Sequence, residues 1–305
     1  MKLGIKVNAD QASFTRLSEA NPPLVEVWFN VNAADGYTEL FDELKRRKCD
    51  VGLHFWGKLD DHIAPNIAYP DQKLIDGSIA LMRQTIDIAA ANRFQYVNIH
   101  PGAAAKSKVD YAKENYTVTG DPVDLETATE LFLENARTLH MYALSRNVVF
   151  TVETVPARIT RGWYDEKARL NPNNIYELPA SAIAEAASSG LWIANDFCHT
   201  AANVITDDPD VVWTYLKDFT NHVAAATKLI HLGFVMPPYN GTDNHDELDN
   251  PILNTDAAVP NTKQMLELLK LFQNRDDVWI LVEPKKNHVK NYRLAQKLLD
   301  QAFSI

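Results

Sequence analysis

Side chains that bind transition metals follow an apolar run near residue 195. Residues 191–194 are apolar, and Asp196 and His199 come just after them, three residues apart. A carboxylate at the last residue of a strand and an imidazole in the turn after it can reach the same ion. Carboxylate oxygen and imidazole nitrogen together suit Zn²⁺, Mn²⁺ or Fe²⁺. Such a pair is common, so the prediction of a metal site depends on whether other apolar runs end in the same way.

Five other apolar runs do end in metal-ligand residues, namely His54, His100, Glu153, His231 and Glu283. The segment after His231 adds Asp243 and His245. Buried ionised carboxylates are costly unless they are paired or bound to a metal ion, so acidic residues after apolar runs favour a metal site. Nine candidate ligands are too many for one ion, and they predict two or three ions of Zn²⁺, with Mn²⁺ or Fe²⁺ as alternatives.

Clustered divalent ions suit phosphoryl chemistry. Neighbouring ions can activate a water molecule, hold the oxygens of a phosphate ester and stabilise the alkoxide that leaves. The predicted ligand set therefore favours an enzyme that acts on phosphate esters.

The elements that would position these ligands alternate regularly along the chain. Short apolar runs occupy residues 3–7, 24–31, 50–55, 94–99, 148–152, 191–195, 228–232 and 278–282. Segments of helical periodicity occupy residues 12–20, 37–47, 72–91, 124–145, 180–188, 209–222, 262–273 and 289–302. Runs that are apolar on both faces are typical of parallel strands covered by helices. The alternation predicts an α/β fold, a (β/α)8 TIM barrel that forms one domain over residues 1–305.

A doubly wound open sheet is the alternative fold. It is disfavoured because the chain contains no Gly-x-Gly-x-x-Gly segment and only 11 glycines. In a barrel, the residues at the strand ends meet at the C-terminal face, where barrel active sites lie. The long segments 102–121, 156–177 and 233–260 follow the fourth, fifth and seventh strands, so we expect them to border this metal site.

Composition limits the classes of function. The formal charge of −10 argues against non-specific coating of DNA, although basic residues on one face or bound metal ions could still attract a nucleic acid. No apolar run approaches the roughly 18 residues that span a bilayer, and residues 1–7 show no signal peptide pattern. The two cysteines, Cys49 and Cys198, form no disulfide framework. We therefore expect a reduced, cytoplasmic protein with no membrane partner.

Seven short motifs occur in order along nearly the whole chain: Gly-Leu-His54, His100-Pro-Gly, Glu153-Thr, Asp196-Phe-Cys-His199, Ile-His231-Leu, Asp243-x-His245 and Val-Glu283. In these motifs the chain resembles the endonuclease IV family, which belongs to the xylose isomerase-like TIM barrels. His-Pro-Gly and Asp-x-Cys-His are the most specific of them. The resemblance implies a trinuclear zinc site that cleaves DNA 5′ to abasic sites.

The resemblance also implies a role for each ligand. Glu153 would bridge two ions and help to position the nucleophilic water. His54 and His100 would hold one ion together with Glu153. Asp196, His231 and Glu283 would surround a second ion. His199, Asp243 and His245 would hold the third.

Three segments depart from the family pattern. The segment after the fifth strand, with Arg158, Arg161, Trp163 and Tyr164, is longer than the pattern predicts. Asp246-Glu-Leu-Asp-Asn-Pro follows His245 in place of a glycine-rich segment. His231 is followed by Leu-Gly-Phe-Val-Met-Pro rather than by the usual Asn-Asp. These differences concern the substrate more than the metal ions.

The first functional hypothesis is an abasic-site endonuclease whose partner is DNA that contains abasic sites. Aromatic side chains could wedge into a kinked duplex, and basic side chains could contact phosphates. Candidates near the metal face are Trp56, Lys106, Arg158, Arg161 and Trp163.

The second hypothesis is an isomerase or epimerase of the same superfamily that acts on a small sugar or sugar phosphate. One divalent ion would be held by Glu153, Asp196, His231 and Glu283. The two glutamates would be the catalytic residues that move a proton at the carbons beside a carbonyl. This hypothesis gives His245 no obligatory role. A third class, a non-catalytic barrel that binds a metal or a sugar, is also open.

Overall fold

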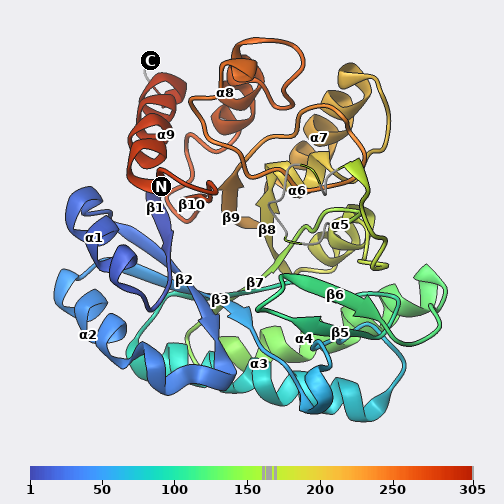
Figure 1. Cartoon of the computed structure of the whole chain (residues 1–305). Coiled ribbons are helices and arrows are strands. Elements are labelled where there is room, and N and C mark those ends of the chain that lie inside the picture. The colour runs from blue at the N-terminus through green and yellow to red at the C-terminus, as the bar shows by residue number, and fades with distance from the viewer. Residues whose placement is uncertain (160–161, 163–166, 168–169, 304–305) are drawn as a thin grey trace.

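Eight parallel strands close into a barrel in the computed structural model, which describes residues 1–159, 162, 167 and 170–303 (Figure 1). The barrel strands are β1 (Lys2–Val7), β2 (Leu24–Asn30), β3 (Asp50–Trp56), β4 (Tyr96–Ile99), β7 (Val149–Glu153), β8 (Trp192–Asp196), β9 (Thr227–Leu232) and β10 (Trp279–Val282). β1 pairs with β2 on one side and with β10 on the other. The predicted (β/α)8 barrel is therefore confirmed, and the open sheet is excluded.

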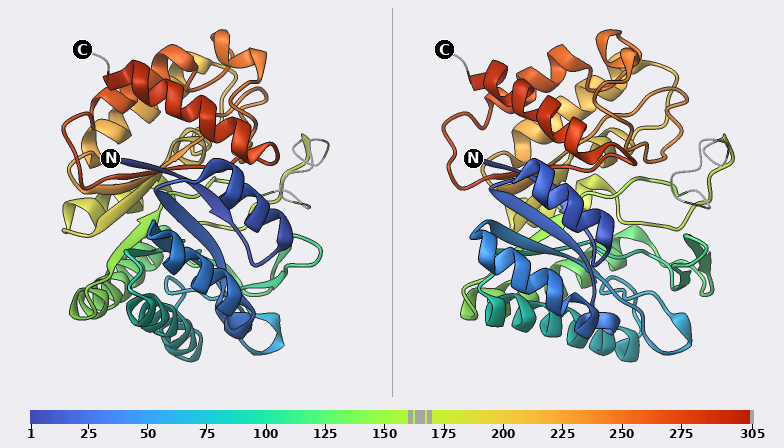
Figure 2. Two further views of the ribbon diagram at one scale, coloured as in Figure 1. Left: turned by 90° about the vertical axis from the view of Figure 1, so that its left-hand side faces the viewer. Right: turned by 60° about the vertical axis from the view of Figure 1, so that its left-hand side comes forward.

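Helices cover the outside of this barrel (Figures 1 and 2). They are α1 (Gln11–Ala20), α2 (Thr38–Arg47), α3 (Gln72–Asn92), α4 (Leu125–Ser145), α5 (Ala180–Ser188), α7 (Pro209–Val223), α8 (Thr262–Lys270) and α9 (His288–Phe303), and the short α6 (Phe197–Ala201) follows β8 directly. Acidic side chains begin several of them: Asp124 accepts a hydrogen bond from Thr127 N, and Asp208 accepts one from Asp210 N. These caps satisfy free backbone N–H groups and fix where α4 and α7 start.

The segment after β4 contains an antiparallel hairpin, β5 (Ser107–Asp110) and β6 (Asn115–Val118), which the sequence analysis treated as loop. Within β5 and β6, Val109 is the single buried residue, so the hairpin has no apolar alternation that would reveal it. Short 3-10 helices occupy Val31–Tyr37, Asp60–His62 and Pro251–Asn254. Among the described residues, no helix has the length and apolar character that a membrane span requires.

The interior of the barrel changes from apolar to charged along the strands. A small buried cluster, separate from the main core, consists of Leu24, Tyr96, Ala194, Leu229 and Leu281. Two positions after each of these residues stands a polar one: Glu26, Asn98, Asp196, His231 and Glu283. Side chains two positions apart share one face of a strand, so these polar groups lie directly above the apolar cluster. The barrel thus places a layer of charge between its apolar floor and its C-terminal mouth.

Candidate metal centre

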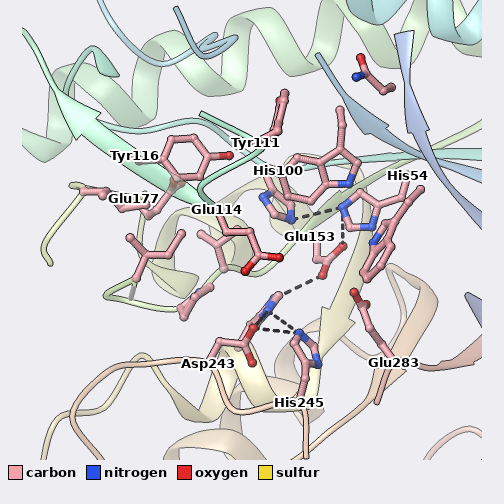
Figure 3. A pocket seen from close by; sticks show the side chains of 18 of the residues that line it. His54, His100, Tyr111, Glu114, Tyr116, Glu153, Glu177, Asp243, His245 and Glu283 are labelled. Atoms are coloured by element: carbon pink, nitrogen blue, oxygen red, sulfur yellow. Dashed lines mark hydrogen bonds and ion pairs between the residues drawn. The ribbon is translucent and has the colours of Figure 1, made fainter. Parts of the chain in front are cut away.

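The nine predicted ligands come together at the C-terminal ends of the strands, where seven of them line one cavity. Six of them, together with the cavity walls, are labelled in Figure 3, where their side chains point toward one another. Seven of the nine are buried, and His100 and Asp243 are partly exposed. Asp243 and His245 come from the segment after β9, yet His245 is only 3% exposed. That segment folds back into the barrel mouth instead of extending into solvent.

The first group of ligands consists of His54, His100 and Glu153, whose ligand atoms lie within 4.8 Å of one another. His54 Nε2 lies 3.2 Å from His100 Nε2 and 3.6 Å from Glu153 Oε2. Two imidazole nitrogens that share a tetrahedral zinc ion lie about 3.3 Å apart, so this spacing fits a common ion. Burial lowers the pKa of His100 to about 3, which keeps its ring neutral as a metal ligand must be.

The second group consists of Asp196, His199 and His245, with Asp243 beside it. His199 Nε2 lies 3.2 Å from His245 Nε2, and Asp243 Oδ2 lies 3.0 Å from the same His245 nitrogen. Asp196 Oδ1 accepts a hydrogen bond of 2.9 Å from His199 N, which holds His199 at the start of α6. Asp196 Oδ2 is buried and makes no hydrogen bond within the described part of the chain. A buried carboxylate oxygen without a donor fits a bound cation.

The third group joins Glu153, Asp196 and His231. His231 Nδ1 lies 3.1 Å from Glu153 Oε1, 3.5 Å from Asp196 Oδ2 and 3.4 Å from Glu283 Oε2. Burial disfavours the charged ring, but the carboxylates of Glu153 and Glu26 outweigh it and raise the pKa of His231 well above its usual range. Burial likewise opposes ionisation of Glu153, and the rings of His231 and His54 overcome it and lower the pKa of this carboxyl. Converging carboxylates around one ring nitrogen need a positive charge, which a proton or a divalent ion can supply.

A fourth group, Glu26, His231 and Glu283, has the composition of a metal site but already holds a cation. Lys6 Nζ lies 2.5 Å from Glu283 Oε2 and 3.2 Å from Glu26 Oε1. The carboxylates of Glu283 and Glu26 outweigh the effect of burial and raise the pKa of Lys6 above its usual value, so it remains an ammonium. Neither Lys6 nor Glu26 is among the residues that the sequence predicted for this site. The sequence feature that could have identified them is a charged residue inside an otherwise apolar run, 3–7 for Lys6 and 24–31 for Glu26.

A cavity of about 270 Å³ opens above the ligands. Its walls include five aromatic and two acidic residues: Trp28, Tyr37, Trp56, Tyr111, Glu114, Tyr116 and Glu177. The ring of Trp56 stacks on His54 with centroids 5.5 Å apart. The β5–β6 hairpin and its turn supply the wall that carries Tyr111, Glu114 and Tyr116 (Figure 3). A side cavity of about 60 Å³ shares part of this wall.

The five predicted substrate-binding residues have different positions. Trp56 and Arg158 line the cavity. Lys106 is not among its described lining residues, and Lys106 Nζ instead lies 2.9 Å from Asp71 Oδ2. Arg161 and Trp163 lie outside the residues that the structure describes.

Glu177 is a cavity residue that the sequence analysis did not select. Its Oε2 is shielded from solvent and has no hydrogen-bond partner among the described residues. Burial raises the pKa of this carboxyl to about 8. The backbone around it is held firmly, because Ala104 N donates to Tyr176 O at 2.7 Å and Leu178 N donates to Gly102 O at 3.2 Å. The segment after β7 thus presents a carboxyl group to the cavity from a fixed position.

Comparisons with known proteins give one distant sequence similarity. No family model matches the sequence. A stretch of 110 residues is 27% identical to "Probable endonuclease 4" of Haloarcula marismortui and covers 36% of this chain. The match spans 38% of the length of that relative.

Solved structures share the fold over nearly the whole chain. A D-tagatose 3-epimerase-like protein superimposes with a TM-score of 0.66 at 14% identity, covering 100% of this chain and 99% of that one. Endonuclease IV from Thermus thermophilus superimposes with a TM-score of 0.57 at 16% identity, covering 99% of this chain and 100% of that one. The chain therefore has the fold of the xylose isomerase-like TIM barrels. The predicted resemblance is confirmed as a common fold with a weak sequence match to endonuclease 4.

Proposed function

We propose that this protein is a metal-dependent phosphodiesterase with two or three zinc ions and that it hydrolyses DNA at abasic sites. The observation that carries the proposal is the second ligand group, in which His199, Asp243 and His245 converge beside Asp196. An isomerase with one ion has no use for these extra ligands. Their burial at the barrel mouth would be costly without a cation to bind.

The same geometry supports a role for each ligand group. His54 and His100 would hold one ion with Glu153; Asp196, His231 and Glu283 would hold a second; and His199, Asp243 and His245 would hold a third. Glu153 directs Oε2 toward His54 and Oε1 toward His199 and His231, at 3.6, 3.3 and 3.1 Å, as a bridging carboxylate would. Bound zinc ions would supply Lewis acidity and an activated water, and Mn²⁺ or Fe²⁺ could do the same.

The cavity walls would hold the substrate over the ligands. Arg158 would pair with a phosphate, because a guanidinium matches the geometry of phosphate oxygens. Trp56 and Tyr111 present ring faces and edges against which a displaced sugar or base can pack. Close walls of this kind also keep bulk water away from the ester.

Metal analysis together with a cleavage assay tests the proposal. Purified protein should contain two or three transition-metal ions per chain and should cut a labelled duplex 5′ to a single abasic site. The same duplex with a normal nucleotide at that position is the control and should remain intact. One ion per chain with no cleavage of the abasic duplex would count decisively against the proposal.

A second candidate is a sugar or sugar phosphate isomerase or epimerase, and the character of the cavity favours it. Arg158 is the only lysine or arginine among the described lining residues, whereas Glu114 and Glu177 are acidic. Acceptors of this kind suit the hydroxyl groups of a small polyol better than a DNA backbone. In this case Glu153 and Glu283 would be the catalytic residues. Interconversion of a ketose by wild-type protein that leaves abasic DNA intact would identify this function.

A further inference from the structure

Glu26 lies directly below the ligands and contacts two of them. Its side chain is fully buried in the middle of β2. Oε1 lies 3.2 Å from His54 Nδ1, and Oε2 lies 3.4 Å from His231 Nε2. One carboxylate therefore touches two histidines that belong to different ligand groups.

These contacts select opposite nitrogens of the two rings. In His54, Nδ1 faces Glu26 Oε1 at 3.2 Å, and Nε2 faces His100 Nε2 at 3.2 Å. In His231, Nε2 faces Glu26 Oε2 at 3.4 Å, and Nδ1 faces Glu153 Oε1 at 3.1 Å. A carboxylate that accepts the proton of one ring nitrogen leaves the other nitrogen available to a metal ion.

Two further groups hold Glu26 in this position. Lys6 Nζ lies 3.2 Å from Oε1, and Tyr96 Oη donates to Oε2 at 3.0 Å. Lys6 and Glu26 are register partners on β1 and β2, so the backbone fixes this pair. With four donors around it, the carboxylate has its accepting capacity filled and no freedom to rotate.

We propose that Glu26 is a positioning residue that sets the metal-binding nitrogen of His54 and of His231 at the same time, with Lys6 and Tyr96 holding it in place. A substitution at Glu26 therefore alters the metal-binding nitrogen in two ligand groups at once. The inference rests on the metal centre of the proposed function, and it is independent of the substrate.

The ring nitrogens can be assigned directly. Protein labelled with ¹⁵N at histidine and loaded with zinc should show His54 protonated at Nδ1 and His231 protonated at Nε2. The reverse assignment of either ring would overturn the inference, whether or not any variant folds. Wild-type protein that binds no zinc would instead overturn the metal centre itself and this inference with it.

Glu26→Gln tests the consequence for affinity. A glutamine has one accepting oxygen in place of two and no negative charge, so it holds the N–H groups of His54 and His231 more weakly than the carboxylate does. Zinc affinity, measured by competition with a chelating dye, should fall about 10- to 100-fold. The ¹⁵N pattern of His54 or His231 should change with it.

Thr227→Val is the matched control. It removes a buried hydrogen bond of 2.9 Å to Val223 O but touches neither Glu26 nor the four donors around it. Zinc affinity and both ring assignments should stay as in wild type, which separates positioning from general disturbance of the barrel interior. Wild-type affinity in Glu26→Gln, with both rings unchanged, would refute the role of Glu26.

Discussion

Two pairs of facing imidazoles are the most informative residues of the site. In the His54–His100 pair and in the His199–His245 pair, Nε2 lies 3.2 Å from Nε2. Two ring nitrogens can face each other at this distance only with a proton or a metal ion to share. The two pairs lie on either side of Glu153, which is why this carboxylate is the central residue of the proposed centre.

The first prediction at this scale concerns His245. His245→Ala should lose one zinc ion, because the second ligand group keeps too few donors. Cleavage of abasic DNA should fall by at least about 100-fold, since a Lewis acid is lost. Elemental analysis and a gel assay measure the two effects. His222→Ala, an exposed histidine on α7, is the control and should change neither. Unchanged metal content with intact ketose interconversion in His245→Ala would favour the isomerase.

The second prediction follows from the raised pKa of Glu177. In the metal-free protein this pKa is about 8, against 4.5 for an ordinary glutamate. Between pH 4.5 and about 8, the folded state therefore binds more protons than the unfolded state does. The free energy of unfolding should fall as pH rises through this range. Glu177→Gln removes this dependence. Its melting temperature should rise relative to wild type as pH increases from about 5 to about 9. A constant difference across that range would contradict the prediction.

At the scale of elements, the β5–β6 hairpin forms the wall that faces the ligands. Tyr111 Oη donates to Gly57 O at 2.5 Å and accepts from Gly57 N at 3.2 Å, and Ala64 N donates to Ser107 O at 2.9 Å. These bonds tie the hairpin to the segment after β3. The wall is therefore a separate small unit attached to the barrel.

Tyr111→Phe should loosen this wall. The variant loses both hydrogen bonds to Gly57 but keeps the ring. Hydrogen exchange of the amides in Ser107–Val118 should become faster, while zinc content should stay unchanged. Equal exchange in the variant and in wild type would show that other contacts hold the hairpin.

The packing of strands inside the barrel gives a fourth prediction. A Cβ on Gly52 would lie 2.0 Å from the ring of Tyr96, which packs on Trp279 with centroids 4.9 Å apart. Gly52→Ala should therefore destabilise the fold by about 1–3 kcal/mol or more, as overpacking does. Chemical denaturation measures the loss. Gly36→Ala, where no atom lies within 4 Å of the added Cβ, should cost much less.

The same elements show what the sequence could reveal. Strand ends and helices follow from periodicity, and the barrel then brings residues such as His54 and Glu283 to one face. Glu26 was missed because a charge inside an apolar run was not interpreted as an interior residue. Its position, two residues after Leu24, carried that information. The hairpin was missed because it buries so little. Whether Arg161 contacts a substrate remains a prediction.

At the scale of the whole molecule, the centre concentrates negative charge within a protein of net charge −10. Glu26, Glu153, Asp196 and Glu283 are buried in the barrel, with Lys6 as the buried ammonium that contacts two of them. Metal ions would offset the remaining charge and so stabilise the folded state. Affinity for metal and stability of the fold are therefore linked.

Removal of metal gives the fifth prediction. A chelator should lower the melting temperature, and added zinc should restore it. The free energy of unfolding should rise with the logarithm of the free zinc concentration, by about 2.7 kcal/mol at 100 times Kd. Mg²⁺ at the same concentration should restore less, because imidazole nitrogens suit it poorly. A melting temperature that does not respond to zinc would contradict the link.

The contact between Lys6 and Glu283 joins residues 277 positions apart, at the seam where β1 pairs with β10. Lys6 can pair with Glu26 on the neighbouring strand soon after both are made, but it meets Glu283 only when β10 closes the barrel. Contacts of such long range form late in folding. A chain that has not closed its seam therefore lacks Glu283 at the ligand cluster. Metal loading would then follow closure of the barrel, and a tightly bound ion would indicate that β1 and β10 have paired.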